Sequence, residues 1–197
     1  MKGALLAMTM ALIATSCSRG EAPDALASPA ATSPAGQTPG ATPCVLEGVN
    51  EESESDEGSG EGPAFLTEVR FDPDGCPRVA FVFENEVPPY EVGYEDPPLS
   101  ECGSGENVPT DGWGASAFLT FHSNSASGVD LSKDPYRETY TGDKDIDVSA
   151  PVLRRIRGTC DFEATLEWVI ALDERRPFRV FTLSDPPRLV VDISAGA

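Results

Sequence analysis

The sequence predicts an all-β protein: an antiparallel β-sandwich of about seven or eight strands, preceded by a disordered tether. Three observations lead to this prediction. Apolar residues recur with a period of two in several short segments after residue 63, turn-forming residues separate these segments, and no segment shows a convincing amphipathic helical pattern. The chain also has 18 Gly and 18 Pro in 197 residues, a composition that favours short strands and turns over long helices.

The chain begins with the features of a sorting signal. Lys2 precedes an apolar run over residues 4–14, and small residues lead to Cys17. This run is too short to cross a bilayer of about 30 Å as a helix, and it fits the apolar region of a signal peptide. We therefore predict a lipoprotein signal peptide over residues 1–16. Two cleavage sites stay open: "ATS" suits an ordinary signal peptidase, whereas "IATSC" resembles a bacterial lipobox in which Cys17 carries the lipid.

The cysteine count favours lipidation. Outside the cytoplasm, Cys44, Cys76, Cys102 and Cys160 imply two disulfides, so Cys17 is left unpaired unless its sulfur carries a lipid. We thus expect a lipid-anchored protein on the outer face of the cytoplasmic membrane. Three pairings are open to the other four. Because Cys76 starts the second predicted strand and Cys102 follows the third, a meander would join Cys76 to Cys102 and leave Cys44 for Cys160.

Residues 17–62 are predicted to form a flexible tether. They are rich in Ala, Pro, Ser, Thr and Gly and end in the acidic run "NEESESDEGSGEG". Such a composition cannot bury enough apolar surface to fold. A small apolar segment, "PCVLEGV", surrounds Cys44, and we expect its disulfide to attach it to the domain. The folded domain is accordingly predicted over residues 63–197.

Seven segments of this domain read as strands. Residues 65–71 and 78–84 flank the turn "DPDGCP" as a hairpin, 90–94 follow, and 117–122 come after a long loop at 96–116. Residues 164–172, 178–183 and 188–193 complete the set. Burying the alternate residues of the last segment contributes about 1.5–3 kcal/mol each, so this segment should close the core. The residues predicted to face the core are Phe65, Val69, Phe71, Val79, Phe81, Phe83, Tyr90, Val92, Tyr94, Leu166, Trp168, Ile170, Leu189, Val191 and Ile193.

The segments "FRVFTLSDPPRLVVDIS", "RFDPDGCPRVAFVFE" and "YEVGY" together resemble the AMIN-like domain of actinobacterial envelope lipoproteins. This group is related to the AMIN module of cell-wall amidases and secretin-type proteins. The resemblance covers roughly residues 64–195, and its most specific part runs from Leu183 to Asp192. It implies a β-sandwich in the cell envelope, where AMIN modules are thought to localise their host proteins through peptidoglycan or other envelope contacts. No amidase or secretin domain accompanies the resemblance, so we expect a non-catalytic protein.

The charge of the chain excludes several partners. Acidic residues outnumber basic ones 33 to 14, for a net charge of -19, which disfavours nucleic acid and anionic lipid surfaces. We expect no cofactor and no metal. His122 is the only histidine and has no recognisable nucleophile motif. The segment "DKDID" (143–147) resembles the start of a calcium loop, but Val148 and Arg154 occupy positions that need Gly and a bidentate Glu.

Two groups of residues are candidates for ligand binding. Clustered arginines could bind carboxylates or phosphates of the cell wall, or could pair with the protein's own acidic residues. Aromatic side chains could stack on sugar rings, or could belong to the core. We therefore expect the domain to bind a cell-wall glycan or peptide; the alternatives are an adaptor that binds another envelope protein and an uncharacterised hydrolase. The candidates are Arg154, Arg155, Arg157, Arg175, Arg176, Arg179, Tyr90, Tyr94 and Trp113.

Overall fold

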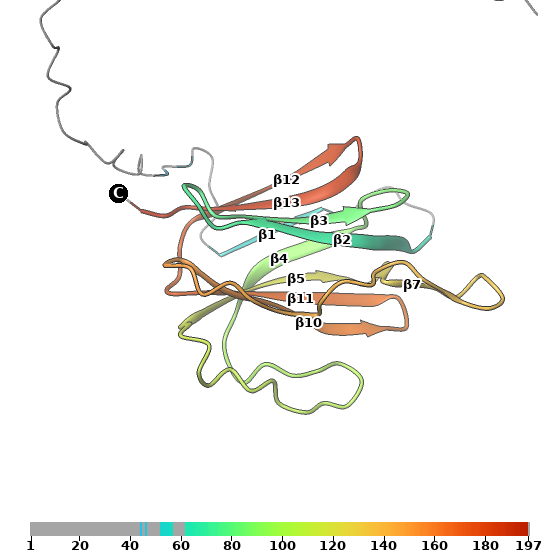
Figure 1. The fold of residues 1–197 in the computed structure, drawn as a ribbon, viewed down its shortest axis with the longest axis horizontal. Helices are drawn as coiled ribbons and strands as arrows, with labels where there is room; N and C mark the ends of the chain where they lie inside the picture. The colour runs from blue at the N-terminus through green and yellow to red at the C-terminus, as the bar shows by residue number, and fades with distance from the viewer. Residues whose placement is uncertain (1–43, 45, 47–51, 57–61, 197) are drawn as a thin grey trace, which may run out of the picture. The chain divides into compact units, whose positions relative to one another are not determined.

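Two sheets pack face to face in the part of the chain that the computed structural model describes, residues 44, 46, 52–56 and 62–196 (Figure 1). The predicted signal peptide, Cys17 and most of the predicted tether lie outside these residues. Within them every regular element is a strand, and no helix is long and apolar enough to cross a membrane. The prediction of an all-β sandwich is confirmed.

Antiparallel pairing builds both sheets, and the β2–β6 contact is parallel. The five-stranded sheet has the order β12 (Phe178–Ser184), β13 (Pro187–Ile193), β3 (Arg78–Phe83), β2 (Ala64–Asp72) and β6 (Ala126–Ser127). The six-stranded sheet has the order β1 (Ser53–Asp56), β4 (Tyr90–Glu95), β5 (Ala117–Ser123), β11 (Thr165–Leu172), β10 (Leu153–Phe162) and β9 (Asp145–Asp147). A separate pair joins β7 (Val129–Asp130) and β8 (Arg137–Glu138).

All seven predicted segments form strands, and β10 is a further long strand. The predicted tether is too long, because β1 lies inside the range 17–62 and forms the edge of the six-stranded sheet beside β4. Gly93 allows a close approach of the two strands, since a Cβ at Gly93 would lie 3.2 Å from the Cβ of Ser53. From its acidic composition, the segment that forms β1 was predicted to be a solvated part of the tether. Backbone hydrogen bonds to a sheet edge do not depend on the side chains, so composition could not show this strand.

Aromatic rings from both sheets meet at the centre of the core. The ring of Phe81 on β3 stacks on that of Phe121 on β5, with centroids 4.6 Å apart, and lies 6.1 Å from the ring of Trp168 on β11. All three side chains are fully or almost fully buried. Most of the predicted inward residues of β3, β4, β11 and β13 join this core, so the period-two pattern identified them correctly.

One predicted face is wrong in β2. Phe65 was expected to point inward together with Val69, yet Ala64 and Leu66 are the fully buried residues. The register between β2 and β3 shifts between Leu66 and Glu68, as in a β-bulge. An extra residue reverses the alternation of inward and outward positions, so Val69 again packs on the core. Phe71, at the end of the strand, is 41% exposed.

The disulfides join Cys44 to Cys76 and Cys102 to Cys160, so the predicted pairings are wrong. The prediction placed the second and third strands next to each other in one meander. Instead, β3 and β4 lie in different sheets. The loop after β4 folds back over the six-stranded sheet, where Cys102 donates a backbone hydrogen bond to the carbonyl of Thr159. As expected, Cys44 is attached to the domain by its disulfide.

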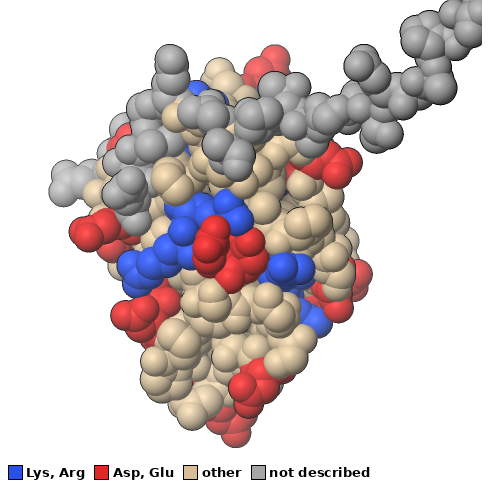
Figure 2. Space-filling view, turned by 90° about the vertical axis from the view of Figure 1, so that its left-hand side faces the viewer, with Lys and Arg blue, Asp and Glu red and all other residues tan. Residues whose placement is uncertain are grey.

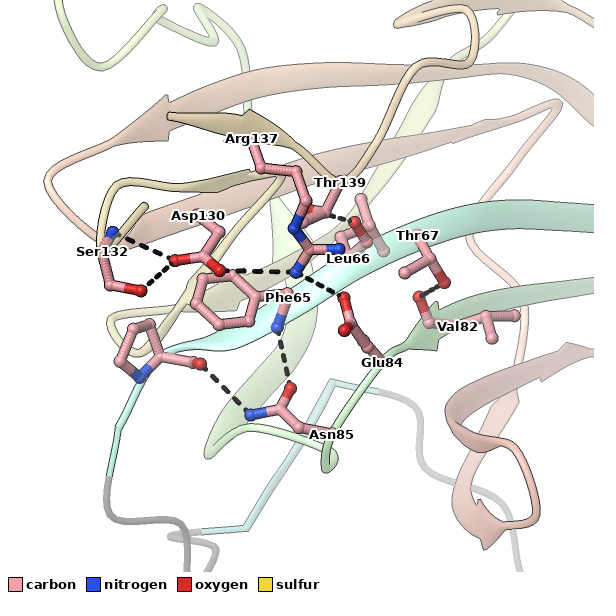
Figure 3. A network of polar contacts seen from close by, with 11 residues as sticks. Phe65, Leu66, Thr67, Val82, Glu84, Asn85, Asp130, Ser132, Arg137 and Thr139 are labelled. Atoms are coloured by element: carbon pink, nitrogen blue, oxygen red, sulfur yellow. Dashed lines mark hydrogen bonds and ion pairs between the residues drawn. The ribbon is translucent and has the colours of Figure 1, made fainter. Parts of the chain in front are cut away.

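Arg137 ties the β7–β8 pair to the body of the sandwich (Figure 3). Its guanidinium lies 2.8 Å from a carboxylate oxygen of Glu84, which follows β3, and 3.4 Å from the buried Asp130. Ser132 donates two further hydrogen bonds to Asp130 from its backbone and its hydroxyl. These contacts hold the segment between β6 and β9 against the edge of the sandwich.

The last strand also holds a buried carboxylate. Asp192 is 1% exposed and accepts hydrogen bonds from Arg78 (2.9 Å) and Arg179 (2.8 Å) on the two neighbouring strands. Burial alone would raise the pKa of Asp192, but these two guanidinium groups outweigh burial and hold the pKa below its ordinary value. At the start of β13, Arg188 donates to the carbonyls of Asp185 and Pro186 in the preceding turn. The ending of the chain is thus a structural element.

We predict that Asp192→Asn lowers the free energy of unfolding by about 2 kcal/mol at neutral pH, because hydrogen bonds to a charged group are lost. Because the pKa of Asp192 is lower in the folded protein than in the unfolded chain, where it is about 3.9, the ionised carboxylate stabilises the fold above about pH 3.9. This stabilisation disappears as the pH falls through the pKa of the folded state. Urea unfolding should therefore show a difference that shrinks below about pH 4. Asp74→Asn, in the exposed β2–β3 turn, is the control. A difference independent of pH would contradict the prediction.

Candidate functional site

A groove crosses the outer face of the six-stranded sheet. The strand registers place Glu91 of β4 opposite His122 of β5, and His122 opposite Glu167 of β11. Because side chains alternate between the two faces of a strand, the same registers that bury Phe121 and Trp168 turn His122 and Glu167 outward. Three strands therefore contribute polar side chains to one row.

The groove consists of two neighbouring hollows. A hollow of about 550 Å³ extends from β1 to β11, and a second hollow of about 300 Å³ continues toward the β5–β6 turn. Glu91 and His122 line both hollows, which are therefore neighbours. The first hollow is lined by Glu52, Ser53, Glu91, Gly93, Tyr94, Glu95, Thr120, His122, Glu167 and Arg175, and the second by Ser55, Asp56, Pro89, Tyr90, Glu91, His122, Ser123, Asn124 and Ser125.

The long loop 96–116 covers the rest of this face. Leu99 and Val108 of the loop are buried against Phe118, Val169 and Ala171, which point outward from β5 and β11. The Cys102–Cys160 disulfide attaches the same loop to β10. The outer face is thus divided into an apolar part beneath the loop and an open polar part, and the groove is the open part.

Carboxylates dominate the charge of the groove. Glu167 accepts a hydrogen bond of 2.6 Å from the hydroxyl of Thr159 and lies 3.4 Å from Nδ1 of His122. Partial burial raises the pKa of Glu95, and the charge of Glu167 raises it further, whereas the hydroxyl of Thr120 opposes the shift. Arg175 brings a positive charge to the rim, 5.0 Å from the centre of the Tyr94 ring.

His122 does not form a serine–histidine relay with its sequence neighbours. Its ring nitrogens lie 3.4 Å from Glu167 and 3.2 Å from Oδ1 of Asn124. Ser123 is 2% exposed and follows His122 in the strand, so its side chain points to the other face. The groove offers carboxylate acceptors, hydroxyl groups and a guanidinium donor, a set that can bind a ligand rich in hydroxyl groups.

Five of the six candidate arginines form ion pairs with the protein's own carboxylates. The end of the sandwich at the left of Figure 1 faces the viewer in Figure 2, where Lys and Arg atoms lie directly against Asp and Glu atoms. The sixth, Arg154, acts on Asp173 through its charge. Hydrogen bonds from Arg176 lower the pKa of Asp173 below its ordinary value, and the positive charge of Arg154 lowers it further. The ion-pair partners are Asp145 and Asp147 for Arg155, Glu101 and Asp145 for Arg157, Asp96 for Arg175, Asp173 and Glu174 for Arg176, and Asp192 for Arg179.

The three candidate aromatic residues are largely occupied by packing. Tyr90 is 8% exposed and belongs to the main core, so the core alternative holds for this residue. Tyr94 is half-buried, and its hydroxyl both donates to the carbonyl and accepts from the amide of Arg176, at 2.8 Å each. The ring of Trp113 packs on Phe118 beneath the loop, and the guanidinium of Arg155 lies 5.3 Å from its centre. Of the three, Tyr94 lines the larger hollow of the groove.

The comparison with protein families agrees with this architecture. The AMIN-like domain family matches residues 64–195. The chain belongs to the AMIN-like domain family. AMIN-like domains are associated with the cell envelope, and the match identifies an envelope-related, non-catalytic domain. Searches of curated proteins and of solved structures find no match.

The acidic segment "DKDID" of this AMIN-like domain contributes strand β9 to the six-stranded sheet. Asp145 and Asp147 lie on the edge strand β9 and pair with Arg155 and Arg157 on β10, as expected for an acidic strand edge. In the described part of the chain, no group of three or more His, Cys, Asp or Glu side chains is placed to hold a metal ion.

Sequence reasoning did not predict the groove of the AMIN-like domain. Glu91, His122 and Glu167 are outward positions of three strands, separated by 31 and 45 residues along the chain (122 − 91 and 167 − 122). The alternation in each strand marks them as polar and outward, and this was the only signal available. Their meeting depends on the order and register of β4, β5 and β11, which single-strand patterns do not contain.

We predict that the pKa of Glu95 lies above its ordinary value and falls in Glu167→Gln, because that variant removes the neighbouring negative charge. NMR titration of the Glu95 side chain measures both values. A raised carboxyl pKa favours the folded state at low pH and costs stability as the pH rises through it. Glu95→Gln should therefore melt at a higher temperature than the native protein at neutral pH, with no difference below about pH 4. An unchanged Glu95 titration in Glu167→Gln would contradict this account.

Proposed function

We propose that this protein is a non-catalytic lipoprotein whose AMIN-like domain binds the glycan strands of peptidoglycan in the groove on its six-stranded sheet. The observation that carries the proposal is that two open hollows lie next to each other on this sheet and share Glu91 and His122. An elongated, open groove suits an extended polymer chain, whereas a closed pocket suits a small molecule. The envelope association of the family supports a wall component as the ligand.

The side chains of the groove match the chemistry of sugars. Each sugar hydroxyl can donate and accept a hydrogen bond, and the groove offers acceptors in Glu91 and Glu167 and a donor in Arg175.

The charge of the groove selects among wall polymers. Carboxylates outnumber the guanidinium of Arg175 in the larger hollow, and the whole chain carries a net charge of -19. Polyanions such as teichoic acids should be repelled. The five arginines that might have attracted them are paired internally. A glycan strand that carries little charge of its own is the wall component that best fits this surface.

We predict that the protein, added to purified insoluble peptidoglycan without teichoic acid, sediments with it, and that Glu91→Ala/Arg175→Ala weakens retention about tenfold or more. Two hydrogen bonds to charged groups account for such a loss, since each is worth about 1.5–3 kcal/mol when made to a charged partner. Glu68→Ala/Arg70→Ala removes a similar exposed pair from the other sheet and should leave retention unchanged. If both double variants are retained equally, the groove is not the binding site for peptidoglycan. Release of soluble fragments would contradict the proposal that the protein is non-catalytic.

An exposed apolar groove favours a second candidate, an adaptor that binds another envelope protein. Leu131 is 76% and Phe162 56% exposed, and both line a hollow of about 330 Å³ with Phe65. Exposed apolar patches rimmed by polar residues often mark protein contacts. Two results together would favour the adaptor. The protein would fail to sediment with peptidoglycan, and it would capture one envelope protein that the Leu131→Ser/Phe162→Ser variant no longer captures.

The proposal includes a lipid on Cys17. Mass spectrometry of the mature protein should find Cys17 as the first residue, carrying at least a diacylglyceryl group, because a single acyl chain gives only weak membrane binding. Cys17→Ala should release the protein from the membrane fraction. A mature N-terminus with a free Cys17 thiol would contradict lipid anchoring and leave the groove proposal to its own test.

A further inference from the structure

The edge strand β12 is long and lacks the usual protection against pairing with another strand. In the described part of the chain, β12 pairs with β13 on one side and with no strand on the other (Figure 1). The other sheet edges, β1, β9 and β6, have four, three and two residues, and the first two are acidic. The seven residues of β12, "FRVFTLS", include no acidic residue, and the charge of Arg179 is paired with Asp192. Short length and free charges normally keep sheet edges apart, and β12 has neither.

The backbone of β12 presents hydrogen-bonding groups to its open side at every second residue. The amide of Val180 donates to a carboxylate oxygen of Glu54 on β1, at 3.3 Å, and therefore points away from β13. The direction of the backbone groups alternates along a strand, so Thr182 and Ser184 also present their amides and carbonyls to the open side. Both residues lie in the exposed half of the strand. This half of β12 can accept hydrogen bonds from, and donate them to, an incoming strand.

The side chains of the same half of β12 offer apolar contact and space. Leu183 is 40% exposed, and Phe181 lies on the same outer face of the sheet, two residues before it. The guanidinium of Arg179, also on this face, lies 5.2 Å from the centre of the Phe181 ring. On the opposite face of the strand, Thr182 and Ser184 line a hollow of about 510 Å³. An incoming strand would thus meet apolar side chains on one face and open space on the other.

The sequence of β12 is complementary to itself about Thr182. If two copies pair antiparallel with Thr182 opposite Thr182, Phe181 of each copy lies opposite Leu183 of the other. The same register places Arg179 opposite the exposed Asp185 of the turn that follows the strand. Opposed apolar residues and opposed charges of unlike sign both stabilise antiparallel pairs. An axis at Phe181 would instead place Arg179 opposite Leu183, and an axis at Leu183 would place Phe181 opposite Asp185.

We propose that the protein pairs with a second copy of itself through antiparallel β12–β12 contact centred on Thr182, which joins the two five-stranded sheets into one. Such a contact has two-fold symmetry and uses the same surface on both copies. The two Thr182 residues exchange hydrogen bonds, and the amide of Ser184 donates to the carbonyl of Val180 of the second copy, while the Val180 amide keeps its contact with Glu54. This dimer goes beyond the proposed glycan binding and does not depend on it, because no residue of β12 lines the groove.

A pair of single-cysteine variants of the full chain tests the register. Hydrogen-bonded residues directly opposite each other have Cα atoms about 5.5 Å apart, within the range of a disulfide, so Thr182→Cys should give a covalent dimer under mild oxidation. Ser184→Cys is the control, exposed on the same edge but separated from its own copy by about 13 Å along the strands, so it should not cross-link. Both variants keep Cys17, so a link through that thiol would appear equally in both. Equal cross-linking by the two variants, or by neither, overturns the proposal.

A proline at position 182 tests the hydrogen bonds of the dimer. Thr182→Pro removes an amide hydrogen that points away from β13, so the pairing within the sheet stays intact, whereas Thr182→Val keeps the amide. In sedimentation equilibrium, Thr182→Pro should raise the dimer dissociation constant about tenfold or more, because each of the two central hydrogen bonds is worth about twofold to tenfold, and Thr182→Val should leave it unchanged. The charge of -19 on each chain opposes association, so added salt should strengthen the dimer. A native chain that stays monomeric at every soluble concentration in salt overturns the proposal. If melting curves show that Thr182→Pro does not fold, the cysteine pair decides.

Discussion

The register between β5 and β11 is the constraint on which the rest of this structure depends. The pairing of Phe121 with Trp168 places two large rings in the core, where Phe81 of the other sheet stacks against them. The next pair in the same register, His122 with Glu167, then faces outward. A slip of one residue would exchange the two faces, burying polar groups and exposing rings. The packing of the core therefore decides which side chains of β5 and β11 face outward into the groove.

The ends of the sandwich are held by polar contacts and disulfides rather than by apolar packing. Asp192 joins β13 to its two neighbours through Arg78 and Arg179, and Arg137 fastens the β7–β8 pair. The Cys102–Cys160 disulfide keeps the long loop over one part of the six-stranded sheet. Most of the few basic residues of this acidic chain are used in this way, which explains why they do not form an open basic patch.

The hollows on the outer face of the six-stranded sheet are open and are lined by charged and hydroxyl groups. A further hollow of about 300 Å³ lies beside β10, and its lining includes Tyr140, Leu166 and Trp168. The two regions therefore present different chemistry, since the first is polar and the second includes part of the aromatic core.

The sequence by itself determined the all-β class, the seven main strands and nearly all of the core, because a period of two is a local property of each strand. It also indicated the family, through a resemblance whose most specific part runs from Leu183 to Asp192. The tertiary structure alone decided the disulfide pairing, the β1 strand, the bulge in β2 and the meeting of Glu91, His122 and Glu167. All of these depend on which strands become neighbours, and that is settled by packing between segments far apart in the chain.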